Sequence, residues 1–191
     1  MLYTRKGDNG TTKTFGCDQR ISKSSAIAEA LGSLDEINSF LGICKIRAKD
    51  SEFTVGDLKI DLIVHDIQQT LFIIQAELAG ADKKVTEEKV TRLETIVDSI
   101  EKILPPIKTF FISGGSELAA LFDIARTIAR RAERRVVAVS EDSVTNSGQA
   151  GVKKVSPETL KYLNRLSSVL YALARLSNHL AGVSEQAPVY K

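Results

Sequence analysis

The sequence has few of the residues from which proteins most often build metal centres and covalent catalytic sites. It holds two cysteines, Cys17 and Cys44, whose spacing fits no zinc motif, and two histidines, His65 and His179, on separate helical patterns. Free thiols in a reducing compartment and structural histidines are the simpler interpretations. A zinc centre and a Ser-His-Asp triad are therefore disfavoured.

Other absences narrow the class of protein. No apolar run of about 18 residues or more occurs, so no membrane-spanning helix is expected, and no secretory signal precedes Tyr3. The net charge of only +2 leaves no general electrostatic footprint for nucleic acid. We therefore expect a cytoplasmic protein with no membrane or nucleic-acid partner, in which any basic binding site is local.

Helical periodicity covers most of the 191 residues, a length that suits one domain. Strand signals are weak, and apolar residues recur at helical spacing in five segments. We predict a single all-α domain over residues 1–191, with an irregular N-terminal segment (1–24) and a five-helix bundle (25–191). The first four predicted helices cover roughly residues 25–48, 60–78, 87–103 and 116–141, and the fifth begins at 157, has its last apolar-stripe residue at Leu176 and ends before Gly182.

The second of these helices is apolar over an unusually wide part of its surface. Leu62, Val64, Phe72 and Ile73 lie outside its main apolar stripe. A helix of this kind is usually buried on several sides, either inside a bundle or between subunits.

The opening stretch, from Tyr3 to Phe15, reads YTRKGDNGTTKTF and has two interpretations. Asn9-Gly10 is a signal for a tight hairpin turn. Alternatively, Gly7 and Gly10 let backbone N–H groups converge on an anion, with Thr, Lys and Arg side chains adding donors and charge. The flanks do not alternate between apolar and polar residues, so a hairpin would have little to bury. The stretch is not a Walker A loop, and the sequence alone leaves both interpretations open.

A second basic feature reads ARTIARRAERRVV, from Ala125 to Val137. Arg126, Arg130 and Arg134 recur every four residues and therefore share one side of the predicted helix, where like charges repel. Three guanidinium groups in a row suit a triphosphate, because each binds phosphate oxygens in a bidentate fork. A solvated basic face or an RNA-binding helix is an equally good interpretation of this feature alone.

Two further stretches border apolar surface. Asp35, in GSLDEINSFLG, lies beside the stripe of the first helix and has either solvent or an arginine as its partner. Thr109 to Ser116 reads TFFISGGS, in which two aromatic residues precede a glycine pair and a helix start. A core plug followed by a helix cap is the simpler interpretation there, and an apolar pocket wall is the functional one.

Taken together, these features resemble the PduO-type ATP:cob(I)alamin adenosyltransferases. The resemblance runs nearly end to end, through YTRKGDNGTT, GSLDEINSFLG, ISGGSELAALFDIARTIARRAERRVV and YLNRLSSVLYALAR in the family's order. The RRAER and YLNRLS segments are the most specific. The chain departs from the family pattern at Ser113, Asp123 and Ser168, and at Ser24-Ser25 after the loop lysine.

The resemblance implies a five-helix bundle that assembles as a homotrimer, with ATP and the corrinoid meeting at subunit interfaces. It implies transfer of the 5′-deoxyadenosyl group of ATP to the cobalt of reduced cobalamin, with Mg²⁺ as a cofactor. A reductase or an adenosylcobalamin-dependent enzyme is a possible partner. The runner-up function is a helical module that binds RNA or another polyanion, and a structural scaffold is a third possibility.

The resemblance also implies roles for particular residues. Asp35 and Arg126 match an interface ion pair on the corrinoid side, Phe110 matches an apolar wedge beneath the corrin ring, and Arg130 and Arg134 grip the triphosphate. No residue is assigned as a metal ligand. The residues expected to bind ATP are Thr4, Arg5, Lys6, Gly7, Thr12, Lys13, Lys23, Arg130, Arg131, Ala132, Glu133, Arg134 and Asn164.

Overall fold

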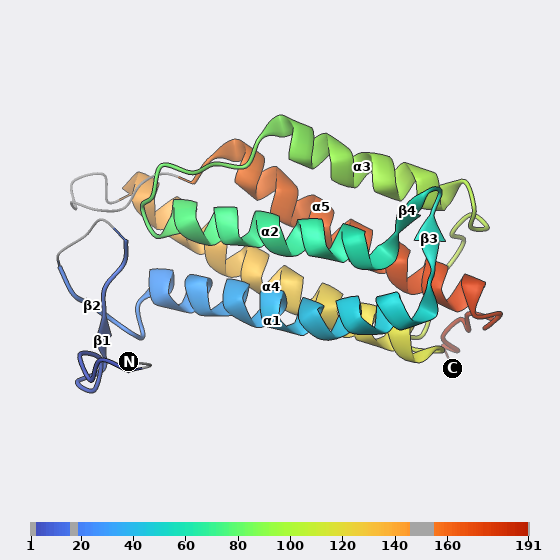
Figure 1. Ribbon diagram of the computed structural model, residues 1–191, viewed down its shortest axis with the longest axis horizontal. Coiled ribbons are helices and arrows are strands. Elements are labelled where there is room, and N and C mark those ends of the chain that lie inside the picture. The colour runs from blue at the N-terminus through green and yellow to red at the C-terminus, as the bar shows by residue number, and fades with distance from the viewer. Residues whose placement is uncertain (1–2, 16–18, 146–154, 191) are drawn as a thin grey trace.

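The five predicted helices are present, and they run lengthwise along the molecule (Figure 1). The computed structural model describes residues 3–15, 19–145 and 155–190. The prediction of an all-α five-helix fold is confirmed over these residues. The helices are α1 (Ala26–Ser51), α2 (Ile60–Leu78), α3 (Glu87–Glu101), α4 (Glu117–Thr145) and α5 (Pro157–Leu180).

Helix α4 packs between α1 and α5, while α2 lies against α1 and α3 lies against α5. Consecutive helices run in opposite directions, so the bundle has two distinct ends (Figure 1). The N-terminal segment lies at the same end as the last turns of α4 and the start of α5. The connection between α3 and α4 lies at the opposite end, together with the residues that follow α5.

The helix ends follow from local chemistry. The side chains of Ser25 and Ser156 each accept a hydrogen bond from the backbone N–H three residues further on, and Pro157 begins α5. Gly80 follows the end of α2 with a φ of 100°, and a Cβ there would come within 3.0 Å of the Phe15 carbonyl oxygen. A glycine is therefore required both to end α2 and to let the N-terminal segment approach it.

Two pairs of very short antiparallel strands accompany the helices. β1 (Thr11–Thr12) pairs with β2 (Ile21–Ser22) in the N-terminal segment, and β3 (Thr54–Val55) pairs with β4 (Leu58–Lys59) between α1 and α2. Gly56, with a φ of 57°, makes the reversal in the second pair possible. Neither pair was predicted, because two residues are too few to show an alternating pattern.

Helix α2 is not buried on every side within one chain. Val64 is fully buried, but Leu62 is 55% exposed and Phe72 is 59% exposed. Ile43 and Ile46 of the neighbouring α1 are exposed as well. Burial inside the bundle therefore accounts for only part of the wide apolar surface, and burial between subunits stays a prediction.

The scarce residue types have ordinary environments where the structure describes them. Cys44 is fully buried, and burial raises the pKa of its thiol to about 12; Cys17 lies outside the described residues. His65 and His179 are exposed, and no cluster of three or more potential metal-binding side chains occurs in the described ranges. None of the helices described is long and apolar enough to cross a membrane.

Candidate functional site

Two separate hollows lie along α4 and α5; we call them together the groove, and one half of it is basic. Arg130 and Arg134 of α4 line this half together with Glu133, and Asn164 faces them from α5. The hollow has a volume of about 310 Å³. Both arginines are exposed, and neither forms an ion pair with another described residue. Their guanidinium groups are therefore available to an anion.

A carboxylate and an amide lie within the same basic half. Asn164 Nδ2 donates a hydrogen bond to Glu133 Oε1 at 3.1 Å. Glu133 is half-buried, and Glu141 also lines the hollow. The groove thus offers carboxylate oxygens, which are ligands that Mg²⁺ prefers, beside guanidinium groups, which bind phosphate.

Two residues of the predicted ATP-binding run do not lie in this groove. Arg131 points toward α1, where its guanidinium pairs with the carboxylate of Glu36. Ala132 is fully buried in the core, so its side chain cannot reach a ligand. The helical period explains both placements, because positions 131 and 132 lie on other sides of α4 than positions 130 and 134.

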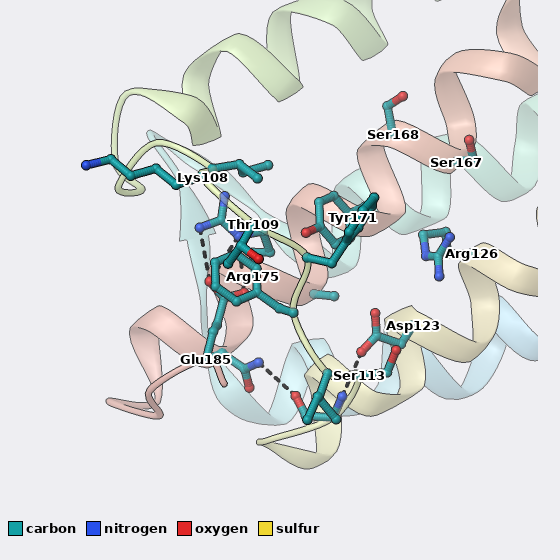
Figure 2. Close-up of a pocket in the computed structure, with 17 residues that line it drawn as sticks. Lys108, Thr109, Ser113, Asp123, Arg126, Ser167, Ser168, Tyr171, Arg175 and Glu185 are labelled. Carbon is teal, nitrogen blue, oxygen red and sulfur yellow. Dashed lines mark hydrogen bonds and ion pairs between the residues drawn. The ribbon is translucent and has the colours of Figure 1, made fainter. Parts of the chain in front are cut away.

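The other half of the groove is a larger cavity of about 750 Å³ with an aromatic wall. Phe110 lines this cavity and is 78% exposed. Tyr171, Ser167 and Ser168 of α5 line the opposite side (Figure 2). The TFFISGGS stretch is therefore a pocket wall, as the functional interpretation had it, and the side chain of Phe110 is not a core plug.

Arg126 is the residue of the aromatic half that lies nearest in sequence to Arg130 of the basic half. It lies one helical turn before Arg130, which is a rise of about 6 Å along α4, and it lines the aromatic cavity. Its guanidinium carbon is 6.0 Å from the centroid of the Tyr171 ring. Its Nε is buried and has no hydrogen-bond partner among the described residues. Asp35 is exposed on α1, and no ion pair between the two is found within the described chain.

The loop that carries Phe110 has no regular structure, but its end is held by side chains of α4 and α5. Asp123 accepts a hydrogen bond from the backbone N–H of Gly114 at 2.8 Å. Asn178 donates to the Gly114 carbonyl oxygen and accepts from the Ser116 N–H, both at 2.8 Å. A Cβ at Gly115 would come within 2.5 Å of Asn178 Oδ1, so only glycine allows this approach.

An ion pair between the buried Arg175 and the half-buried Glu185 holds the other part of the loop. Arg175 Nε lies 3.0 and 3.1 Å from the two carboxylate oxygens of Glu185, and its Nη2 donates to the Pro105 carbonyl oxygen at 3.2 Å. The same guanidinium stacks 5.1 Å from the centroid of the Phe111 ring. Phe111 is therefore the anchor of the loop, and this leaves Phe110 free to project. Sequence reasoning missed this pair because its members are far apart in sequence from the loop they fix.

The N-terminal segment is not a tight hairpin at Asn9-Gly10. Gly10 has a φ of 76°, but Asn9 is not in the left-handed region that a type I′ turn requires. Arg5 takes that conformation instead, with a φ of 58°. The segment folds back on residues 21–23, and the Lys23 ammonium lies 3.2 Å from the position that a Cβ on Gly7 would take.

Arg20 is a residue of this segment that sequence reasoning missed. Its Nε donates to Thr11 Oγ1 at 2.6 Å and its Nη2 to the Thr11 carbonyl oxygen at 2.8 Å. It also binds the carbonyl oxygen of Lys6. The described N-terminal residues, including Thr4 and Thr12, do not line the groove between α4 and α5 of the same chain.

Comparisons with known proteins show the family to which the sequence is similar. The model of the cobalamin adenosyltransferase family matches residues 2–177. The corrinoid adenosyltransferase of Bacillus subtilis is 38% identical over 188 residues, which cover 96% of this chain and 90% of that protein. The PduO corrinoid adenosyltransferase of Citrobacter freundii is 37% identical over 185 residues. That match covers 93% of this chain but only 50% of the relative, so the chain spans about half of that protein's length.

Solved structures show the same fold. One is a phenylalanine-to-alanine variant of a PduO-type ATP:corrinoid adenosyltransferase from Lactobacillus reuteri, complexed with cobalamin and ATP. It matches with a TM-score of 0.83 and 29% identity over 98% of this chain and 99% of that one. An arginine-to-lysine variant from the same organism, complexed with ATP, matches with a TM-score of 0.82.

Proposed function

This chain belongs to the cobalamin adenosyltransferase family, and we propose that it transfers the 5′-deoxyadenosyl group of ATP to the cobalt of reduced cob(I)alamin. One observation carries the proposal. The two hollows along α4 and α5 place an aromatic cavity, which Arg126 lines, one helical turn of α4 from the hollow with the two available arginines. This arrangement suits a flat apolar ring system beside a triphosphate.

The proposed reaction needs no nucleophilic side chain. The electron pair of Co(I) attacks the 5′ carbon of ATP, a Co–C bond forms, and the C5′–O bond breaks with its electron pair going to the departing triphosphate. The nucleophile is supplied by the corrinoid itself. The protein is left with two tasks, to hold both substrates in line and to stabilise charge on the leaving group.

Arg130 and Arg134 are the residues proposed to stabilise the triphosphate. Because the two residues lie four positions apart, both guanidinium groups can reach phosphate oxygens from one side of α4. Mg²⁺ is usually held by one or two carboxylates together with substrate phosphates, and Glu133 in the same groove fits that pattern. When bound, the ion would add positive charge where negative charge develops on the leaving group.

Phe110 is proposed to act on the corrin ring. Its exposed ring projects into the aromatic cavity from a loop that is anchored at Phe111 and Gly114. An apolar ring beneath the cobalt would exclude a donor ligand from its lower face. Loss of that ligand makes reduction of Co(II) to Co(I) easier.

We also propose that the active form is a homotrimer with its sites at subunit interfaces. The exposed apolar side chains of α1 and α2 support an interface, since an isolated chain would leave them in water. The unpartnered Nε of Arg126 and the exposed Asp35 support an ion pair between copies. A neighbouring copy would also bring its N-terminal segment, with Thr4, Arg5, Lys6, Gly7, Thr12, Lys13 and Lys23, to the basic half of the groove.

Because the reaction consumes reduced cobalt, a reductase is the proposed upstream partner, and an enzyme that uses adenosylcobalamin is the proposed downstream one. We place the reaction in the cytoplasm.

The proposal is tested by incubating the chain with ATP, Mg²⁺ and chemically reduced cobalamin. We expect the corrinoid spectrum to change to that of the adenosylated form, with one triphosphate released for each corrinoid converted. An unchanged spectrum, or release of pyrophosphate or phosphate in place of triphosphate, would contradict the proposed reaction.

A further inference from the structure

We propose that Arg165, held by Glu94, is a positioning residue that fixes the orientation of the Asn164 side-chain amide toward ATP. This inference rests on the proposed function, because it assigns Asn164 to the nucleotide. It adds two residues outside the groove lining to the set that determines ATP affinity.

Three hydrogen bonds join four side chains, those of Glu94, Arg165, Asn164 and Glu133, in one continuous series across the bundle. Arg165 Nε lies 2.8 Å from Glu94 Oε1 of α3, and Arg165 Nη1 lies 2.9 Å from Asn164 Oδ1. Asn164 Nδ2 in turn donates to Glu133 Oε1 of α4 at 3.1 Å. This series of hydrogen bonds therefore runs from α3 through α5 to α4, and it ends in the basic half of the groove.

Donor and acceptor chemistry permits only one orientation of this amide. Arginine has donors and no acceptor, so the side of Asn164 that faces Arg165 must be the carbonyl oxygen. An ionised Glu133 has acceptors and no donor, so the side that faces it must be the NH₂ group. Rotating the amide by half a turn would place donor against donor and acceptor against acceptor.

The fixed orientation has a consequence for the ligand. One N–H of Asn164 is used by Glu133, which leaves the second N–H for an acceptor in the groove, such as an oxygen of ATP. Arg165 does not itself line the groove, and its charge is balanced by Glu94. Both side chains are more than 40% exposed, at 43% and 44%, and exposed pairs contribute little to folding stability. Their proposed role is therefore to orient Asn164 rather than to hold the helices together.

A matched control exists in the same interface. Lys161 of α5 pairs with Glu87 of α3, with Nζ 3.1 Å from Oε2, one turn of α5 away from Arg165. Arg165→Met and Lys161→Met each remove one ion pair between the same two helices. Only Arg165→Met removes a contact to Asn164. A difference in ATP affinity between the two variants therefore measures the effect of orienting the Asn164 side-chain amide.

The experiment measures the dissociation constant for ATP with Mg²⁺ by calorimetry in four variants, with KM and kcat for ATP in parallel. The variants are Arg165→Met, Lys161→Met, Asn164→Ala and the double variant Asn164→Ala/Arg165→Met. We expect Arg165→Met to raise Kd and KM about fivefold, which corresponds to about 1 kcal/mol, with kcat changed less than about twofold. Lys161→Met should change Kd, KM and kcat by less than about twofold. In the Asn164→Ala background, Arg165→Met should cause no further rise in Kd or KM.

Equal effects of Arg165→Met and Lys161→Met would overturn the inference while leaving the proposed function intact. The inference would also be overturned if Arg165→Met still raised the Kd for ATP fivefold in the Asn164→Ala background. Failure of the unmodified chain to bind ATP would overturn the proposed function, and the inference with it.

Discussion

Arginines of one helix have different surroundings, and these decide what each can do. Arg130 faces an open groove, Arg131 is occupied by Glu36, and Arg126 lies against an aromatic ring with its Nε buried. Their spacing in the sequence predicted a shared face only for positions four apart. The anion-binding capacity of α4 is therefore concentrated in Arg130 and Arg134 rather than spread along the whole run.

Replacing Arg130 with alanine should lower turnover at saturating ATP by at least about tenfold, or about 1.4 kcal/mol of transition-state stabilisation. The reason is the loss of a guanidinium group that faces the departing triphosphate. Arg135→Ala is the control, because Arg135 is exposed on the same helix and lies 4.0 Å from Glu29 instead of in the groove. Steady-state rates with pre-reduced corrinoid are measured for the Arg130→Ala and Arg135→Ala variants. Near-normal turnover of Arg130→Ala would rule out the role given to Arg130.

Phe110 should matter more for reduction than for transfer. We expect Phe110→Ala to slow the reaction that starts from Co(II) more than the reaction that starts from pre-reduced Co(I), because only the first requires the lower face of the cobalt to be freed. The two assays are compared in the same variant. An equal loss of rate in the two assays would contradict the role of Phe110 as a wedge beneath the corrin ring.

Among the elements, α5 is the one on which the site most depends, and a buried carboxylate fixes its start. Glu77, at the end of α2, is 7% exposed. Its Oε1 accepts from the Ser156 N–H at 2.8 Å and its Oε2 from Thr159 Oγ1 at 2.5 Å. Both donors belong to the first turn of α5 or its cap. The end of one helix thus sets the position of the helix that carries Asn164 and Tyr171.

Glu77→Ala should destabilise the fold by about 2 kcal/mol, because two buried donors lose their acceptor. Urea unfolding at one fixed protein concentration measures the change. Glu88→Ala, which removes an exposed carboxylate at the start of α3, is the control and should have little effect. Equal stability of the two variants would contradict a capping role for Glu77.

The sequence was most informative about the elements themselves. Helix α5 could be predicted because Ser156 and Pro157 mark its start and its apolar residues repeat at helical spacing. The β3–β4 pair was missed, although Gly56-Asp57 is a turn signal, because its strands are only two residues long. The contacts of Arg175 with Pro105 and of Glu94 with Arg165 join residues about 70 positions apart. Such contacts depend on tertiary packing and leave no local pattern.

At the scale of the whole molecule, one chain does not bring all the predicted site residues together. Asp35 and Arg126 are not paired within it, and the N-terminal segment does not line the groove of its own chain over the described residues. An assembly in which neighbouring copies complete each other's sites would resolve both observations. Activity should then depend on contacts between copies of the chain.

Subunit mixing tests that link. Asp35→Ala and Arg126→Ala should each lower activity, because each removes one member of the proposed pair between copies. When the two variants are co-expressed and purified as hybrids, some interfaces regain both native residues and activity should rise above that of either variant. Activity no greater than the average of the two separate variants would contradict a shared site.

In the proposed reaction, cobalt takes the 5′ carbon of ATP. The most direct test is a single turnover of the unmodified chain with pre-reduced cobalamin and ATP labelled with ¹³C at the 5′ position, followed by NMR of the corrinoid product. We expect the label to be bonded to cobalt and one intact triphosphate to appear for each corrinoid. Label that remains in ATP, or in an adenosine product not bonded to cobalt, would contradict it.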